Sequence, residues 1–261
     1  MQSAKKSLGQ NFLKDKNIIN KILNLFILKN KNIIEIGPGK GALTDEILRR
    51  KPSKLTLIEK DNNLYKFLKD RYRNNNILKI YNNDILKFPL EKIVKKETII
   101  LGNLPYNISS QILVQILRFK KWPPKFSDLI FMFQKELGEK VVSIYPSSGY
   151  GRLSILSNLK LKIDQSFLVS PNSFSPKPKV TSMIIHFKPK LKKIYKIKNL
   201  KTLEKITNIL FSNKRKMVNK SLKKILSYNE IRKIKDLDLS SRPSELKPEV
   251  YYKIAEIYES K

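Results

Sequence analysis

The fold of this 261-residue chain is decided by the stretch Ile33-Ile34-Glu35-Ile36-Gly37-Pro38-Gly39-Lys40-Gly41-Ala42-Leu43-Thr44. An apolar run precedes three alternate glycines and a helical pattern follows them, which predicts a strand, a tight turn and a helix start. Gly37 and Gly39 would let the backbone approach a ligand without a Cβ in the way. Gly41 would open a helix whose free N–H groups face the same point. We therefore expect a nucleotide-like ligand here, with an ordinary glycine-rich turn as the alternative. The G-x-G-x-G spacing is one residue shorter than the dinucleotide fingerprint.

Three further strand-like runs end beside polar residues. Lys54–Glu59 ends in a carboxylate about 20 residues beyond the glycines, where nucleotide-binding sheets place the acid that accepts hydrogen bonds from ribose hydroxyls. Ile77–Tyr81 precedes Asp84, which is placed to bind an adenine amino group, although Asn-Asn-Asp is also ordinary turn chemistry. Thr98–Gly102 leads directly into Asn103. Open parallel sheets bind ligands at the carboxyl ends of their strands. We expect four residues to meet at that edge: Gly37, Glu59, Asp84 and Asn103.

The segment Asn103-Leu104-Pro105-Tyr106 indicates the chemistry. The N6 nitrogen of adenine is a poor nucleophile because its lone pair is delocalised into the ring, so methylation requires freeing that pair and aiming it at an activated methyl group. The amide oxygen of Asn103 and the carbonyl oxygen of Pro105 would each accept a hydrogen bond from N6, which favours a pyramidal nitrogen. Tyr106 would stack on a base drawn out of its helix or loop. The alternative is a structural turn with Tyr106 in the core.

Six segments, taken in order, carry a resemblance to one known family. They are Leu8–Leu13, Ile36–Gly41, Asn103–Tyr106, Met132–Glu136, Tyr150–Ser154 and Pro171–Ser182. With these motifs, over nearly its whole length, the chain resembles the KsgA family of small-subunit ribosomal RNA adenine dimethyltransferases. That family lies within the class I S-adenosylmethionine-dependent methyltransferases.

The resemblance implies an α/β fold with a Rossmann-like, mostly parallel sheet whose last strand is antiparallel, and a small all-α C-terminal domain. It implies S-adenosyl-L-methionine as the cofactor, with the N-terminal arm folded over it and with Asn11 and Leu13 lining its site. Gln10 is a further candidate for that site. Phe174 would close the pocket against the target adenine, opposite Tyr106; a core anchor for its loop is the competing interpretation. The expected cofactor-binding residues are then Asn11, Leu13, Gly37, Gly39, Glu59, Asp84 and Asn103.

Composition favours a nucleic-acid partner. The chain has 54 Lys and Arg against 22 Asp and Glu, a formal charge of +32, which would hold a polyanion in a salt-sensitive way. Codon bias is the competing explanation, because lysine far outnumbers arginine. With no cysteine and one histidine, His186, we expect no disulfide and no metal site, and we interpret His186 as structural. We also expect no signal peptide, no membrane span, a cytoplasmic location and a monomer.

The order of the predicted elements divides the chain in two. Strands and helices alternate up to strand Leu129–Phe133, with helices predicted at Asp15–Leu28, Ala42–Arg50, Asn62–Tyr72 and Ser109–Phe119. A helix over 134–142 follows, and Leu161–Val169 and Thr181–Phe187 are predicted as the last strands, paired antiparallel. The Lys- and Pro-rich segment 188–199 is the predicted boundary. We therefore expect a cofactor-binding catalytic domain over residues 1–190 and a helical RNA-binding domain over 198–261.

The helical tail carries a dense basic surface. Over Asn208–Leu226 the residues Phe211, Val218, Leu222 and Ile225 trace an apolar stripe at helical spacing. Further helices are predicted over Glu230–Lys235 and 248–260. The basic residues expected to grip RNA are Lys214, Arg215, Lys216 and Lys220, and a solvated helix face is the alternative.

Taken together, these features predict a methyltransferase that would act, like the family, on two adjacent adenines near the 3′ end of small-subunit ribosomal RNA, in ribosome biogenesis. One rival is an erythromycin-resistance-type methyltransferase acting on large-subunit RNA, but Leu8–Leu13 and Phe211–Lys216 look more like the ribosome-assembly branch. A mainly non-catalytic assembly factor is a second rival, and the intact Asn103–Tyr106 argues against it. The glycine spacing and Asn103–Tyr106 disfavour a nicotinamide dehydrogenase.

Overall fold

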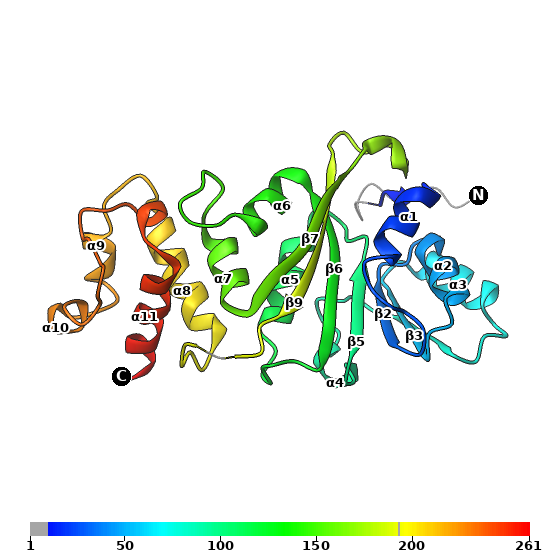
Figure 1. Ribbon diagram of the computed structural model, residues 1–261, viewed down its shortest axis with the longest axis horizontal. Coiled ribbons are helices and arrows are strands. Elements are labelled where there is room, and N and C mark those ends of the chain that lie inside the picture. The colour runs from blue at the N-terminus through cyan, green and yellow to red at the C-terminus, as the bar shows by residue number, and fades with distance from the viewer. Residues whose placement is uncertain (1–9, 193) are drawn as a thin grey trace. The chain divides into compact units, whose positions relative to one another are not determined.

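The computed structural model describes residues 10–192 and 194–261 (Figure 1), so the first part of the predicted arm, including Leu8 and Gly9, lies outside the described residues. Two compact units are present, one with the chain up to Gly138 plus 163–189 and one with 139–162 plus 190–261. The sequence predicted a single boundary near residue 190. Segment 139–162 instead groups with the C-terminal helices because its helix packs on two of them, α8 and α11.

A seven-stranded sheet forms the first unit, in the order β4-β3-β2-β5-β6-β9-β7. β2 pairs in parallel with both β3 and β5, β4 and β6 extend this parallel array, and β9 runs antiparallel to β6. The predicted mostly parallel sheet is confirmed. The chain order reverses across β2 and β5, so their carboxyl ends flank the switch point where open sheets bind ligands. The strands are β2 (Asn32–Ile36), β3 (Lys54–Glu59), β4 (Leu78–Asn82), β5 (Thr98–Gly102), β6 (Phe126–Gln134), β7 (Leu161–Val169) and β9 (Ser182–Pro189).

Helices connect the parallel strands as the sequence predicted, with one clear shortening. The Asp15 side chain accepts hydrogen bonds from the backbone N–H groups of Asn17 and Ile18 and so caps the first helix. This helix ends at Leu23, five residues before the predicted end, and Arg50 donates to the Leu23 carbonyl oxygen there at 2.7 Å. The helices are α1 (Lys16–Leu23), α2 (Ala42–Arg49), α3 (Asn62–Arg71), α4 (Leu90–Ile93), α5 (Ser109–Leu117) and α6 (Lys135–Val142).

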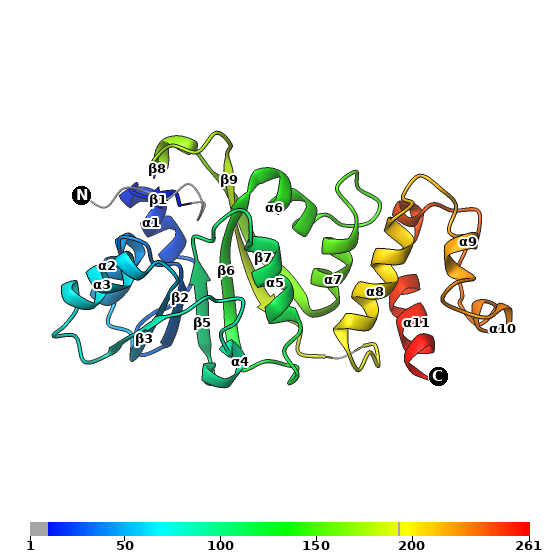
Figure 2. The ribbon, with the colours of Figure 1, turned by 180° about the vertical axis from the view of Figure 1, so that it is seen from behind.

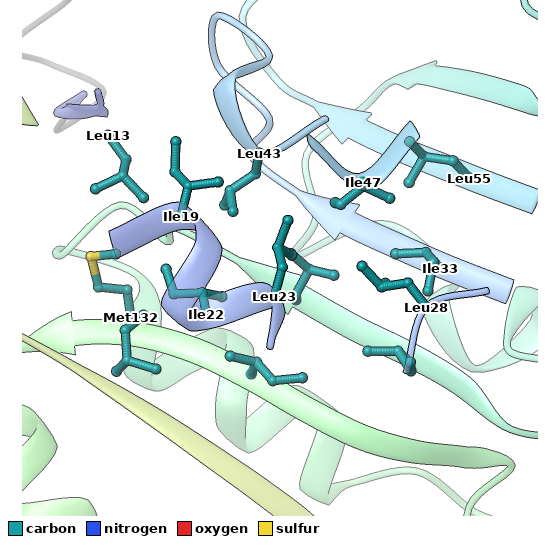
Figure 3. Close-up of a cluster of buried hydrophobic side chains, with 14 of the residues drawn as sticks. Leu13, Ile19, Ile22, Leu23, Leu28, Ile33, Leu43, Ile47, Leu55 and Met132 are labelled. Atoms are coloured by element: carbon teal, nitrogen blue, oxygen red, sulfur yellow. The ribbon is translucent and has the colours of Figure 1, made fainter. Parts of the chain in front are cut away.

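Helix α1 contributes the centre of a hydrophobic core. Ile19, Ile22 and Leu23, at i, i+3 and i+4 spacing, are buried together with side chains of α2 and β6 (Figure 3). Each such side chain contributes roughly 1.5–3 kcal/mol when fully buried. Leu13 of the N-terminal arm joins the same cluster. The arm is therefore attached to the core of the sheet unit and not only to its surface.

A two-stranded ribbon ties the arm to a distant loop. β1 (Phe12–Leu13) pairs antiparallel with β8 (Phe174–Ser175), and the two strands lie side by side in Figure 2. Next to the ribbon, the Lys14 N–H donates to the Ser173 carbonyl at 2.9 Å and the Ser173 hydroxyl donates to Asp15 at 3.0 Å. The loop before β8 contains a 3₁₀ turn over Pro171–Ser173. Two-residue strands carry no alternating pattern, so the sequence did not predict this pairing.

The second unit is helical, as predicted, and the helix predicted over 248–260 is present, but its other helices differ from those expected. The predicted helix over 208–226 is wrong: a helix ends at Phe211, and the Lys216 N–H then closes a turn on the Asn213 carbonyl at 2.8 Å. The Val218 N–H donates to Ser241, which draws the chain away from the helix axis. A helix over 152–160 was not predicted. The helices are α7 (Arg152–Lys160), α8 (Leu200–Phe211), α9 (Asn219–Leu222), α10 (Tyr228–Ile231) and α11 (Pro248–Glu259), with a 3₁₀ turn at Pro243–Glu245.

None of the helices in the described part of the chain is long and apolar enough to cross a lipid bilayer.

We predict that Gly102→Ala destabilises the sheet unit. A Cβ at Gly102 would lie 2.6 Å from the backbone oxygen of Ile36 and 2.8 Å from Leu104 Cδ2, so neighbouring strands must shift. The expected loss is about 1–3 kcal/mol of unfolding free energy, measured by urea denaturation. Gly151→Ala is the matched control, because the nearest atom to its Cβ would be 3.8 Å away. Equal stability of the two variants would contradict this packing.

Candidate active site

A pocket opens at the carboxyl edge of the parallel strands. It is lined by three segments: the arm, the β2–α2 turn and the loop after β5. Its empty space, including the part open to solvent, is about 560 Å³. The lining residues are Gln10, Asn11, Phe12, Leu13, Glu35, Gly37, Pro38, Gly39, Lys40, Ala42, Leu43, Asn103, Leu104, Pro105 and Tyr106.

The pocket brings together seven of the residues that the sequence singled out. Five are from the predicted cofactor set and three from the predicted catalytic set, with Asn103 in both. They are Asn11, Leu13, Gly37, Gly39, Asn103, Pro105 and Tyr106. Glu59, Asp84 and Phe174 do not line it.

The turn between β2 and α2 needs its glycines. Gly37, Gly39 and Gly41 have φ angles of +67°, +60° and +84°, in the left-handed region that side chains with a Cβ rarely adopt. Space is short as well: a Cβ on Gly39 would lie 2.8 Å from the Phe12 ring, and one on Gly41 would lie 2.5 Å from the Tyr72 hydroxyl. The turn therefore presents bare backbone and the N-terminus of α2 to the pocket.

Glu59 lies at the end of β3 and holds this turn from behind. Its carboxylate accepts the Gly39 N–H at 3.2 Å and the Asp61 N–H at 2.8 Å. Asp61 in turn accepts a hydrogen bond from the Gln10 amide at 3.1 Å, which links the acid pair to the arm. Burial raises the pKa of Glu59, with the two backbone N–H groups opposing the rise. Its predicted role as the acceptor for ribose hydroxyls stays a prediction.

Asp84 follows β4 and is engaged by a lysine. Its carboxylate lies 2.8 Å from the Lys60 ammonium and accepts the Leu86 N–H at 3.0 Å. The hydrogen bond from Lys60 lowers the pKa of Asp84. A carboxylate so placed is ionised at neutral pH, and the predicted contact with an adenine amino group stays a prediction.

The Asn103–Tyr106 loop presents its polar atoms in a fixed orientation. Asn103 Nδ2 donates to the Asn11 carbonyl oxygen at 2.8 Å, which leaves the amide oxygen to accept hydrogen bonds. The Pro105 carbonyl accepts the Ile108 N–H at 3.1 Å and keeps a second lone pair. The Tyr106 hydroxyl lies 2.6 Å from Ser182 Oγ at the start of β9, so its ring is held at the pocket wall.

Phe174 does not line the pocket, and its predicted role, facing the adenine opposite Tyr106, stays a prediction. Its side chain is 1% exposed and belongs to the same core cluster as Leu13 and Ile19. The β1–β8 pairing directs it there, because Phe174 is the register partner of Leu13. The structure thus places Phe174 where the competing interpretation put it, as the anchor of its loop.

Glu35 is a site residue that the sequence reasoning missed. It lies within β2, is 1% exposed, lines the pocket and accepts the Thr44 hydroxyl at 2.7 Å. Burial raises its pKa to about 8. The signal was present, since Glu35 is the lone acid in the apolar run before the glycines. Lys40 was missed as well, and its ammonium lies 4.9 Å from the centre of the Phe12 ring at the pocket rim.

The predicted RNA-binding residues lie elsewhere, in the second unit. Lys214, Arg215 and Lys216 occupy the turn between α8 and α9, and Lys220 lies in α9. All four are exposed. Three of these basic residues thus lie on a turn and one on a short helix, and not on the predicted continuous helix.

His186 is buried in the sheet and has no place in the pocket. Its Nε2 lies 2.7 Å from Asp128 Oδ1 on β6, and Nδ1 lies 3.4 Å from Asp164 on β7. These contacts fit the structural interpretation. Among residues 10–192 and 194–261, no three His, Asp or Glu side chains are grouped so that they could hold a metal ion.

Comparison with known proteins decides the family. A family model described as ribosomal RNA adenine dimethylase matches residues 1–260. The chain belongs to the ribosomal RNA adenine dimethylase family. It is 44% identical over 260 residues to the ribosomal RNA small subunit methyltransferase A of Pelagibacter ubique, covering 98% of this chain and 97% of the relative. A protein of the same name from Francisella tularensis subsp. novicida is 40% identical over 232 residues, 87% of each chain.

Solved structures agree with this dimethylase fold. A dimethyladenosine transferase from Plasmodium falciparum matches with a TM-score of 0.76 and 27% identity over 93% of this chain and 95% of that chain. The 23S rRNA methyltransferase ErmE matches with a TM-score of 0.70 over 95% and 100%, but at 22% identity this likeness shows the fold alone. The Rossmann-like class I methyltransferase fold and the family expected from the motifs are both confirmed.

The dimethylase family uses S-adenosyl-L-methionine as its methyl donor, and the pocket fits such a group. The glycine turn forms a cradle that a Cβ at Gly39 would fill, and the first residues of α2, Ala42 and Leu43, line the pocket beside it. Glu35 lines the pocket, and Glu59 lies directly behind the turn. Carboxyl oxygens so placed can accept hydrogen bonds from the hydroxyl and amino groups of such a ligand.

We predict that Glu35→Gln removes a pH dependence of stability. Burial raises the pKa of Glu35 from 4.5 to about 8 on folding, so the unfolded chain releases this proton at a lower pH than the folded protein does. The stabilisation is then complete below about pH 4.5 and is lost as the pH rises to about 8. The variant should gain thermal stability relative to wild type between pH 5 and pH 8.

The measurement is the difference in Tm between variant and wild type across that range. Glu97→Gln is the control, because the hydrogen bond from Lys31 lowers the pKa of Glu97 and this variant should show no such gain. A constant difference in Tm for Glu35→Gln would mean that Glu35 is ionised in the folded protein.

Proposed function

We propose that this enzyme transfers methyl groups from S-adenosyl-L-methionine to N6 of two adjacent adenines near the 3′ end of small-subunit ribosomal RNA. The product is N6,N6-dimethyladenosine, and the enzyme acts as a cytoplasmic monomer in ribosome biogenesis. The observation that carries the proposal is the Asn103 amide, which is held by the Asn11 carbonyl so that its oxygen is available to an amine in the pocket. The named function of the 44%-identical relative supports the choice of the small subunit.

The cofactor supplies an electrophilic methyl group on a sulfonium. The chain supplies orientation. With the Asn103 amide oxygen and the second lone pair of the Pro105 carbonyl accepting its two N–H bonds, the adenine N6 becomes pyramidal and its own lone pair is directed at the methyl group. The N6 proton becomes acidic once nitrogen carries the new bond, so no side chain needs to act as a strong base.

Tyr106 would hold the base. Its ring lines the pocket and its hydroxyl is fixed by Ser182 at 2.6 Å, so little side-chain freedom is lost when an extruded adenine stacks on it. The same geometry serves a base that already carries one methyl group, because one accepting oxygen is enough to hold the remaining N–H.

The RNA grip would come from the exposed basic turn of the second unit. Lys214, Arg215, Lys216 and Lys220 are exposed, and a formal charge of +32 raises the local concentration of any polyanion. The likeness of fold to ErmE alone gives no ground for preferring large-subunit RNA. A mainly non-catalytic assembly factor would have no need for an oriented amide at the pocket wall.

We predict that Asn103→Ala lowers the methyl-transfer rate about 100-fold or more, because the acceptor that orients N6 is lost in the transition state. The assay is single-turnover transfer to small ribosomal subunits at saturating cofactor and RNA, where binding defects no longer limit the rate. Tyr106→Phe keeps the ring and should be mild, whereas Tyr106→Ala should weaken capture of the base. A near wild-type single-turnover rate for Asn103→Ala would refute the mechanism.

We predict that neutralising Lys214, Arg215 and Lys216 together flattens the salt dependence of RNA binding. Each lost phosphate contact should reduce the slope of log K against log salt by about 0.7–0.9. Calorimetry should find the affinity for S-adenosyl-L-methionine unchanged. An unaltered slope would mean that these three residues form a solvated surface that does not contact phosphates.

A further inference from the structure

A second pocket lies within the helical unit, and the proposed reaction does not use it. Its empty space is about 950 Å³, including the part open to solvent. The walls come from the segment before α7, the end of α7, the linker before α8 and the start of α11. The residues that carry the argument are Tyr145, Lys190, Lys192, Ile194, Tyr195, Lys247 and Tyr252.

Aromatic rings form one wall. The Tyr195 and Tyr252 ring centres are 4.7 Å apart at an interplanar angle of 55°. The Tyr252 hydroxyl donates to the Ile155 carbonyl at 2.9 Å, so Tyr252 is fixed and buried, while Tyr195 is partly exposed over it. Tyr145 is held by its own hydroxyl, which donates to the Glu245 carbonyl at 3.1 Å. This wall is a preformed aromatic platform.

The rim is basic, and apart from Asn158 and Glu249 the rest of the lining is aliphatic or aromatic. Lys192 and Lys247 are exposed at the rim, Lys190 is half-buried, and Glu249 is the one acidic residue of the lining. Ile194 is 77% exposed, so its side chain is accessible to a ligand. Stacking faces beside a positively charged rim are the combination that proteins use for single-stranded nucleic acid, because every base has a π-face and every nucleotide a phosphate.

We propose that this pocket binds an unpaired nucleotide of the substrate RNA, with the base against Tyr195 and Ile194 and the flanking phosphates at Lys192 and Lys247. The inference rests on the proposed function, in which the substrate is ribosomal RNA. The pocket would give the enzyme a contact with a nucleotide of that RNA other than the methylated adenine. An acidic protein segment fits less well, because the Tyr195 and Tyr252 rings offer stacking faces that carboxylates do not use.

Fluorescence anisotropy with a labelled, unstructured RNA octanucleotide, without cofactor, tests the stacking. Tyr195→Leu should weaken binding about 5-fold or more, as expected for the loss of one base–aromatic stack, and Tyr195→Phe should bind like wild type. Tyr228→Leu is the matched control, since Tyr228 is 60% exposed in the same unit but does not line the pocket. Equal affinity of Tyr195→Leu and wild type overturns the proposal.

Salt titrations should distinguish the contribution of the basic rim to RNA binding from that of the aromatic wall. Lys192→Gln with Lys247→Gln should reduce the salt slope by about 0.7 per lost contact on single-stranded RNA, whereas Tyr195→Leu should lower affinity at every salt concentration without changing the slope. If the variants bind the octanucleotide normally but bind intact small subunits weakly, the pocket takes a protein and the proposal is wrong.

Photocrosslinking of the wild-type protein to the same octanucleotide carrying 5-bromouridine gives a test that needs no variant. Mass spectrometry should find the crosslink on the peptide that contains Tyr195 or Tyr252, and crosslinks confined to other peptides overturn the proposal. These binding tests do not involve methyl transfer. If the Tyr195→Leu protein binds RNA and transfers methyl groups like wild type, the nucleotide-binding proposal for this pocket is wrong, whereas the proposed function is not affected.

Discussion

The hydrogen bond from the Asn103 amide to the Asn11 carbonyl is the contact on which the active site depends. It spans 92 residues of sequence and fixes which end of the amide faces the pocket. Its geometry is set by the arm, and the arm is held by the β1–β8 ribbon and by Leu13 and Phe174 in the core. Packing of two apolar side chains thus helps to orient a polar group of the Asn103–Tyr106 loop.

Two buried acidic side chains lie close to the glycine turn. In a chain with a formal charge of +32, two buried acids, Glu35 and Glu59, lie within or directly behind the pocket. Burial raises the pKa of both. The Glu59 carboxylate accepts hydrogen bonds from the backbone N–H groups of Gly39 and Asp61. An acidic side chain therefore holds in place the glycine backbone that a ligand would contact. A pocket lined by an acidic residue thus lies in a protein whose net charge suits a polyanion.

The sheet and the position of the site could be predicted from the sequence, because local sequence patterns determine them. The apolar runs ending at Gly37, Glu59 and Asn103 defined the sheet edge, and the family motifs confirmed its class. The features that the sequence did not predict depend on contacts between residues that are distant in sequence. Phe174 could not be assigned to the core without knowing that it pairs with Leu13, and the turn after Phe211 depends on Val218 bonding to Ser241. Glu35 was visible as a lone acid in an apolar strand, but only the pocket gives it a role.

The central claim is that this pocket dimethylates adenines of small-subunit RNA, and the modified bases themselves test it most directly. Unmethylated small and large ribosomal subunits would be incubated separately with the pure protein and isotope-labelled S-adenosyl-L-methionine, and the RNA digested and read by mass spectrometry. We expect two adjacent N6,N6-dimethyladenosines near the 3′ end of the small-subunit RNA and no label in the large subunit. Label in large-subunit RNA, or none in either, would contradict it.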